Sequence, residues 1–224
     1  MTSPFLPEIF PYPSVVTREG PIPASMPELL PEELACVDRA VLVRQLDFAA
    51  GRVLARSALE ALGVQGFALL PDLKGAPRWP PSIAGSITHT RRVGQGFAGV
   101  VAAPRAAVRS LGVDAESEDG LTEELWPSVL RDEERARLDA LPAGERRAAA
   151  SLIFSAKESY YKLQYALTGQ FLDFMAATIE ADFAAGTFRV IVRQEAGTEF
   201  RPGDVLQGRF ARREGIVVTG MILP

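Results

Sequence analysis

The sequence predicts an α+β fold made of two halves that meet near residue 112. Three observations support this prediction: each half contains a long segment of helical composition, each half also contains segments typical of β-strands, and the net charge changes sign between the halves. The 224 residues, 47% of them hydrophobic, suffice to bury the core of one domain or of two small ones. A charged fraction of 23% argues against global disorder.

In the first half we expect one long helix, followed by strands. Residues 1–31 are rich in proline, which fixes φ and removes a hydrogen-bond donor, so we expect extended segments and no regular helix there. Residues 32–62 are dominated by Ala, Leu, Val and Arg, and they predict a helix that stops at Gly63. The remaining segments are short extended pieces at 67–90 around a turn at 74–77, and strands at 97–103 and 107–114.

In the second half we expect two helices, followed by strands. An acidic segment at 114–124 leads into a helix predicted for 122–140, and a longer helix is predicted from about 144 to 168, ending at Gly169. Strands are predicted at 190–192, 205–210 and 216–222. We therefore divide the chain into an N-terminal half, 1–112, and a C-terminal half, 113–224.

Charge and composition exclude several classes of function. The formal net charge is −4 and the pI about 5.2, whereas a general nucleic-acid binder is usually basic. Residues 1–113 carry a net +2 and residues 114–224 a net −6, which suits a polyanionic ligand held partly through a metal, although an arginine-rich solvated face gives the same pattern. With Cys36 the only cysteine, without a signal peptide and without an apolar run of about 18 residues, we expect a cytoplasmic protein that does not enter membranes.

Two acids mark the predicted strand that begins the second half. Asp114 and Glu116 alternate with apolar residues, so on a strand both side chains point the same way, roughly 7 Å apart. Two carboxylates on one face repel each other, and a divalent cation such as Mg²⁺ relieves that repulsion. Solvated acids at a strand end are the plain alternative.

A second cluster lies in the long helix of the second half. Phe154, Glu158 and Lys162 share one helical face at spacing i, i+4, i+8, and the last two form an ordinary surface ion pair unless they have another role. The chain has three lysines against 21 arginines, and Lys157 and Lys162 flank Glu158. A protein that otherwise uses arginine therefore places the compact charge of lysine at these two positions.

Two further segments are suited to phosphate. Thr88 and the single histidine, His89, follow a short strand and can donate hydrogen bonds to phosphate oxygens. In the first helix Arg52 and Arg56 are i, i+4 neighbours, with Arg44 two turns earlier, and such like charges are unfavourable unless an anion lies between them. Arginines that extend along a wet face are the alternative.

In this order the segments resemble the 4′-phosphopantetheinyl transferase superfamily, and most of all the branch that contains the enterobactin synthetase D component. The resemblance spans roughly residues 40–172. The matching pieces are Ala50-Gly51-Arg52 with Ala55-Arg56, Lys74-Gly75-Ala76-Pro77-Arg78-Trp79-Pro80, Gly85-Ser86-Ile87-Thr88-His89, Gly112-Val113-Asp114-Ala115-Glu116, and Phe154-Ser155-Ala156-Lys157-Glu158-Ser159 with Lys162.

The resemblance implies two similar α/β halves related by a pseudo-twofold axis, with the active site at their junction. It implies an enzyme that moves the phosphopantetheine arm of coenzyme A to a serine of an apo acyl, peptidyl or aryl carrier protein and releases adenosine 3′,5′-bisphosphate. Its Mg²⁺ ligands would be Asp114, Glu116 and Glu158. Lys162, Thr88 and His89 would contact the phosphates, with Lys157 supporting the site.

The remaining expectations concern the far end of coenzyme A and the carrier. The resemblance implies that Arg44, Arg52 and Arg56 hold the 3′-phosphate, with the turn Lys74-Gly75-Ala76-Pro77 beside the adenine. Glu158, or a metal-bound water that it orients, is our choice of general base. We expect a monomer, with carrier docking at Arg91 and Arg92 or at Leu125 and Trp126. A Mg²⁺-dependent phosphohydrolase and a non-catalytic module that binds carrier proteins are the alternatives, and the pathway, whether siderophore, polyketide, peptide or fatty-acid synthesis, is left open.

Overall fold

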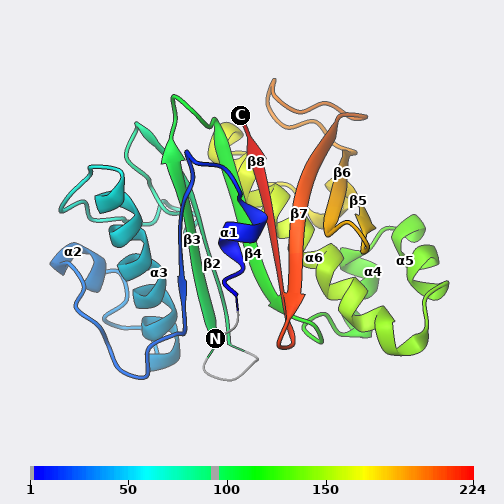
Figure 1. Ribbon diagram of the computed structural model, residues 1–224, viewed down its shortest axis with the longest axis horizontal. Helices are drawn as coiled ribbons and strands as arrows, with labels where there is room; N and C mark the ends of the chain where they lie inside the picture. The colour runs from blue at the N-terminus through cyan, green and yellow to red at the C-terminus, as the bar shows by residue number, and fades with distance from the viewer. Residues whose placement is uncertain (1–2, 92–95) are drawn as a thin grey trace.

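The computed structural model describes residues 3–91 and 96–224, and it confirms the α+β class with two antiparallel sheets (Figure 1). The first sheet has the strand order β1-β3-β2 and the second the order β4-β8-β7-β6-β5. The strands of the first sheet are β1 Val16–Gly20, β2 Ile83–Thr90 and β3 Phe97–Pro104. Those of the second sheet are β4 Ser110–Ser117, β5 Ala177–Asp182, β6 Thr187–Val192, β7 Val205–Arg213 and β8 Ile216–Leu223.

One long helix packs on each sheet. Helix α3, Leu42–Ala61, packs on the first sheet and buries a face of small residues, and Gly51 on that face leaves room for Ile87 of β2. Helix α6, Ala143–Thr168, packs on the second sheet and ends, as predicted, at Gly169, which has a left-handed φ of +63° that glycine adopts without strain. Within the described ranges, neither these helices nor any other combines the length and apolar composition needed to cross a membrane.

Helix α6 lies unusually close to strand β4. A Cβ built on Gly112 of β4 would be 1.9 Å from the backbone oxygen of Ser159 in the helix. Only a glycine fits there, because that separation is far inside van der Waals contact. The close approach brings the strand that carries Asp114 against the helix that carries Glu158 and Lys162.

Two segments predicted as single helices and one predicted to lack helix differ in the structure. Residues 32–62 form two helices, α2 Pro31–Leu34 and α3, because Val41 has extended backbone angles and begins the second helix afresh. Residues 122–140 form the short elements η1 Glu123–Leu125, α4 Trp126–Val129 and α5 Asp132–Asp139, separated where Leu130 and Arg131 are extended. The proline-rich start also contains one helical turn, α1 Leu6–Ile9, since a proline in a first turn loses no helical hydrogen bond.

Other differences concern the strands and the boundary between halves. Strands β1 and β5 were not predicted, and the strand predicted at 107–114 lies three residues later, as β4. Because β4 pairs with β8, the change of sheet falls between Pro104 and Ser110 and not at residue 112. The two sheets meet where β2 runs beside β4, and the Ser86 hydroxyl accepts the backbone N–H of Val113 at 3.1 Å.

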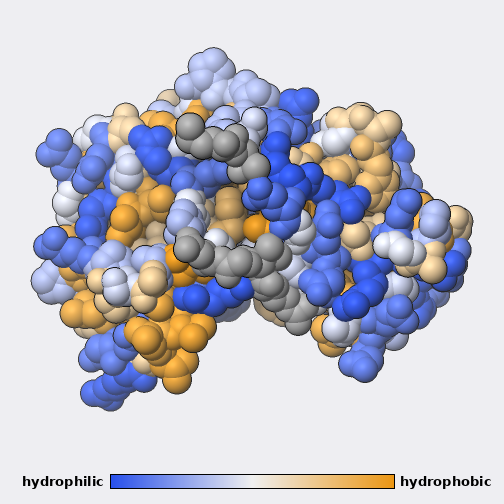
Figure 2. Space-filling view, turned by 60° about the horizontal axis from the view of Figure 1, so that its bottom comes forward, coloured by the Kyte–Doolittle hydropathy of each residue, from blue (hydrophilic) through white to orange (hydrophobic). Residues whose placement is uncertain are grey.

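The N-terminal segment joins the halves. Leu6, Ile9 and Phe10 are buried in a cluster that includes Val101 of β3 and Val218 of β8. Figure 1 shows α1 in front of the second sheet and β1 beside β3. On the outside, Figure 2 shows hydrophobic surface on the part of the molecule that carries α2 and α3, where Leu34, Val41, Leu42 and Val43 are exposed.

Candidate active site

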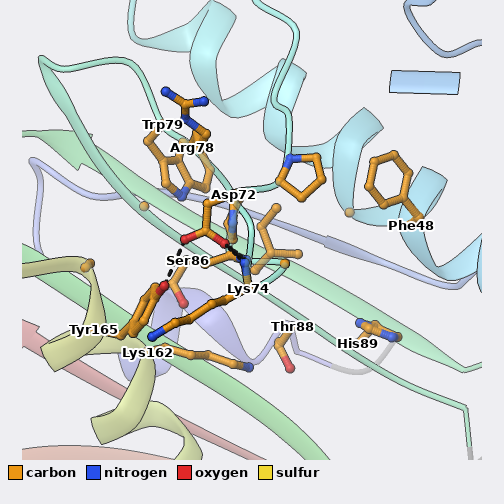
Figure 3. A pocket seen from close by; sticks show the side chains of 18 of the residues that line it. Phe48, Asp72, Lys74, Arg78, Trp79, Ser86, Thr88, His89, Lys162 and Tyr165 are labelled. Carbon is orange, nitrogen blue, oxygen red and sulfur yellow. Dashed lines mark hydrogen bonds between the residues drawn. The ribbon is translucent and has the colours of Figure 1, made fainter. Parts of the chain in front are cut away.

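A cavity of about 880 Å³ lies where the two halves meet. Its walls come from α3, the turn around residues 71–79, β2, β4 and α6. Figure 3 shows labelled side chains from α3, the turn, β2 and α6 around it. Most of the predicted site residues line it. They are Arg44, Arg52, Lys74, Gly75, Ala76, Pro77, Thr88, His89, Asp114, Glu158 and Lys162.

Asp114 is the centre of the acidic wall. Its Oδ1 accepts hydrogen bonds from Lys162 Nζ at 2.7 Å and from Thr88 Oγ1 at 3.3 Å, and the same ammonium also reaches the Val113 carbonyl at 3.0 Å. Its Oδ2 is buried and has no hydrogen-bond partner among the described residues. A buried carboxylate oxygen without a partner is costly, so this atom is prepared for a ligand.

Glu158 faces the same wall from α6. Burial raises the pKa of this carboxyl, the neighbouring Asp114 carboxylate raises it further, and Lys162 partly offsets both effects. The two carboxylates repel each other, and one of them has an oxygen without a hydrogen-bond partner. Such oxygens are ligands of the kind that Mg²⁺ prefers. The residues present therefore fit a hard divalent cation.

Glu116 lies farther along β4 and is not part of the cavity lining. Its Oε2 points toward Gly120, where an added Cβ would come within 3.0 Å. Across 3–91 and 96–224, no three His, Cys, Asp or Glu side chains are grouped closely enough to hold a metal ion. The structure thus brings Asp114 and Glu158 together and leaves Glu116 outside the pocket.

The arginines of α3 form a cationic wall. Arg52 is buried, its Nε donates to the Leu69 carbonyl at 2.6 Å, and its guanidinium lies 4.0 Å from the centroid of the Phe48 ring. Burial lowers the pKa of Arg52 to about 10, so it stays protonated at neutral pH. A rigidly held guanidinium beside the open Arg44 is suited to a phosphate group.

His89 lines the cavity beside an acid that was not predicted. Its Nε2 is 3.8 Å from Asp47 Oδ2, and Asp47 also forms an ion pair with Arg91. Burial lowers the pKa of His89, and the Asp47 carboxylate opposes that effect. The imidazole is therefore mostly neutral at pH 7 until an anion approaches. Asp47 follows Arg44 by one turn of the same helix, which is the only signal in the sequence that could have located it.

Two residues that we expected in the site, Arg56 at the 3′-phosphate and Lys157 beside Glu158, do not line the cavity. Arg56 pairs with Glu33 of α2 at 2.8 Å. Lys157 is buried on the far side of α6, where its Nζ donates to Glu134 Oε2 and to the Val129 carbonyl, both at 2.7 Å. Each basic side chain is engaged by a glutamate that the helical periodicity does not reveal.

These two glutamates occupy equivalent places in the two halves. Glu33 and Glu134 are each the third residue of a short helix, and each accepts the backbone N–H of the residue before that helix, at 3.2 Å and 2.8 Å. The other oxygen of each accepts a backbone N–H from an extended segment, that of Leu69 at 3.0 Å and that of Ile179 at 2.7 Å. Both halves therefore contain the same arrangement, a buried glutamate that binds the start of a short helix and an extended segment, which we call the glutamate anchor.

The proposed docking residues are spread around the molecule. Arg91 is tied to Asp47, and Arg92 lies outside the described residues. Leu125 is exposed in η1, whereas Trp126 is partly buried and packs against the core of the second half. The structure leaves Leu125 available for a partner.

The chain is similar to proteins of one family along most of its length. Residues 31–103 match the family model described as the 4′-phosphopantetheinyl transferase N-terminal domain, and residues 110–210 match that of the 4′-phosphopantetheinyl transferase superfamily. The chain is 43% identical over 198 residues to 4′-phosphopantetheinyl transferase Svp of Streptomyces mobaraensis, which covers 86% of this chain and 78% of that protein. It is 35% identical over 200 residues to 4′-phosphopantetheinyl transferase PptT of Mycobacterium tuberculosis, covering 87% and 86%.

A third relative, 4′-phosphopantetheinyl transferase Npt of Nocardia iowensis, is 31% identical over 200 residues, covering 85% of this chain and 87% of that protein. The chain belongs to the 4′-phosphopantetheinyl transferase superfamily. It is an enzyme of that class, with coenzyme A as the donor substrate.

Proposed function

We propose that the cavity binds coenzyme A between the two halves, with the reacting phosphate at Asp114, Glu158 and Lys162. The serine hydroxyl of an apo carrier protein attacks that phosphate, and adenosine 3′,5′-bisphosphate leaves. The observation that supports this most directly is the buried, unpartnered Oδ2 of Asp114 beside Glu158, opposite a wall of arginine. A polyanion with a metal at one end matches both walls.

A Mg²⁺ ion is part of this proposal. Asp114 and Glu158 would hold it, and Glu116, which lies outside the cavity lining with its Oε2 toward Gly120, would have to turn to become a third oxygen donor. When bound, the ion offsets the negative charge of the diphosphate.

Side chains of the protein would bind the phosphates and accept the proton. Lys162 and Thr88 already contact Asp114 Oδ1, so a phosphate that reaches this wall meets an ammonium and a hydroxyl donor. Glu158 would accept the serine proton, because it lines the cavity beside Asp114, where the reacting phosphate would lie. His89, Arg44 and Arg52 bind the more distant phosphates, and the Lys74–Pro77 turn lies beside the adenine.

The carrier and the assembly are further proposals. We propose that the enzyme acts as a monomer, since the two halves of the chain together supply the cationic and the acidic wall of the cavity. The motifs favour the branch of the enterobactin synthetase D component, whose pathway would be siderophore synthesis. Carrier proteins are usually acidic, so Arg91, whose partner Asp47 lines the cavity, is the proposed docking residue near the site, and exposed Leu125 is a separate apolar candidate.

The test is incubation with coenzyme A, Mg²⁺ and a panel of apo carrier proteins, read by intact-mass spectrometry. Transfer adds one phosphopantetheine group to the carrier serine and needs the metal. Release of free phosphopantetheine without a modified carrier would instead indicate a phosphohydrolase. Binding of carrier without either product would indicate a non-catalytic module.

A further inference from the structure

One side chain organises the turn at the end of the cavity that we assign to adenine. The Oδ1 of Asp72 accepts the backbone N–H of Lys74 at 2.8 Å and that of Ala76 at 2.9 Å. The backbone closes the same turn, because the Asp72 N–H donates to the Ala76 carbonyl at 2.7 Å and the Gly75 N–H to the Asp72 carbonyl at 3.1 Å. The position of the Asp72 carboxylate therefore sets the shape of the turn.

The other oxygen of Asp72 is bound by the opposite half of the molecule. The Tyr165 hydroxyl of α6 donates to Asp72 Oδ2 at 2.9 Å, and Figure 3 shows the two side chains meeting at the cavity wall. The Tyr165 ring stacks on Tyr161, with centroids 5.6 Å apart and planes at 28°, and Lys74 Nζ lies 5.6 Å from its centroid. The hydroxyl is thus held by a packed ring and not by a loose side chain.

Tyr165 lies on the same face of α6 as the reacting groups. Glu158, Lys162 and Tyr165 follow one another at intervals of four and three residues, which places them along one side of a helix, and all three line the cavity. A bond from Tyr165 to the turn therefore fixes the turn relative to the helix that carries the chemistry.

We propose that Tyr165 is a positioning residue that acts through Asp72 and holds the Lys74–Pro77 turn in place for the nucleotide end of coenzyme A. This inference rests on the proposed orientation of coenzyme A in the cavity. Because the Tyr165 hydroxyl bonds to Asp72 and not to Asp114, Glu158 or Lys162, its loss weakens binding of the nucleotide and leaves the chemical step nearly unchanged. A bond that only stabilised the fold would affect neither quantity in the folded enzyme.

The experiment compares Tyr165→Phe, Asp72→Asn and the double variant with Tyr12→Phe, which removes a hydroxyl from an exposed tyrosine outside the cavity. We expect Tyr165→Phe to raise KM for coenzyme A about 3- to 10-fold, as for the loss of one ordinary hydrogen bond, with kcat changed less than about twofold. The double variant should be little worse than Asp72→Asn, because the two residues act as one unit.

Calorimetry with the two fragments of coenzyme A identifies the end that is affected. Tyr165→Phe should weaken adenosine 3′,5′-bisphosphate and leave 4′-phosphopantetheine unchanged, with an unaltered melting temperature. Unchanged KM and unchanged affinity for both fragments in an active enzyme would overturn the inference while leaving the proposed function intact. Weakened 4′-phosphopantetheine alone would overturn it too, and would show that coenzyme A lies the other way round.

Discussion

The two halves share an anchor and differ in what they present to the cavity. In each half a buried glutamate, Glu33 or Glu134, ties a short helix, an extended segment and one basic residue of the long helix together. Helix α3 then offers Arg52 to the cavity, whereas α6 offers Glu158 and Lys162. The same scaffold thus supplies fixed positive charge on one side and titratable groups on the other. The proposed function therefore assigns binding to the first half and chemistry to the second.

The anchors also differ in their depth. The Lys157 side chain is 2% exposed and Glu134 is fully buried, whereas Arg56 is 22% exposed beside Glu33. If the glutamate is neutralised, the Lys157 ammonium of the second half has no access to water, whereas the Arg56 guanidinium of the first half does. This difference between the halves can be measured.

The largest expected effect is a loss of activity on substitution in the second half, to which we assign the chemistry. Asp114→Ala removes the buried oxygen that awaits a ligand, and we expect carrier modification to fall at least about 100-fold, as for loss of a principal electrostatic group. The measurement is holo-carrier formation by mass spectrometry, with circular dichroism to show that the fold is intact. Glu60→Ala, an exposed acid of α3, is the control. Near wild-type turnover by Asp114→Ala would remove this residue from the reacting centre.

Next come the two anchors, tested as a matched pair. Glu134→Gln leaves the Lys157 ammonium buried beside a neutral side chain, and we expect the free energy of unfolding to fall by about 3–5 kcal/mol. Glu33→Gln should cost clearly less, because Arg56 reaches water. Urea unfolding of both variants gives the comparison. Equal losses would show that the exposure of the partner does not decide the cost.

A smaller effect distinguishes the binding half from the chemical half. Arg52→Ala should weaken coenzyme A about tenfold and 3′-dephospho-coenzyme A hardly at all, since a fixed guanidinium bound to one phosphate contributes most where that phosphate is present. Inhibition or calorimetric binding of both compounds gives the ratio. An equal loss for the two compounds would move Arg52 away from the 3′-phosphate.

The smallest expected effect is a dependence on pH. The pKa of His89 is lowered by burial in the free protein, and a bound phosphate would raise it. Binding therefore takes up a proton, so affinity for adenosine 3′,5′-bisphosphate should rise a few-fold as pH falls from about 8 to about 5 and then level off below the pKa of the free protein. His89→Gln reports the contribution of the ligand's own titration. The same pH dependence in both proteins would exclude protonation of His89.

Much of this site was predictable from the sequence, since its motifs place Asp114, Glu158 and Lys162 in their elements. What could not be predicted depends on contacts between distant residues. Helical spacing cannot show that Lys157 turns to Glu134, 23 positions earlier, or that Tyr165 reaches Asp72, 93 positions earlier. The repeated anchor was hidden as well, because only the glutamates are common to Pro31-Glu32-Glu33 and Asp132-Glu133-Glu134.

The fold was predicted to a similar extent. The composition of residues 144–168 and their glycine stop located α6, because a long periodic helix with a glycine cap is a strong local signal. Strand β5 follows a turn of 3-10 helix, η2 Phe174–Ala176, and has an edge position, so its burial depends on α5 and β6 more than on its own alternation. Local pattern is insufficient where neighbouring elements decide the outcome.

Gly112 has a consequence for how this centre tolerates change. Because bare backbone touches the helix there, a single methyl group would act as a wedge between strand and helix, next to the residues that meet across that seam. The gap between the Asp114 carboxylate and the Lys162 ammonium would widen although neither residue had been altered. The absence of a Cβ atom at Gly112 therefore sets the distance between the charged groups of the strand and those of the helix.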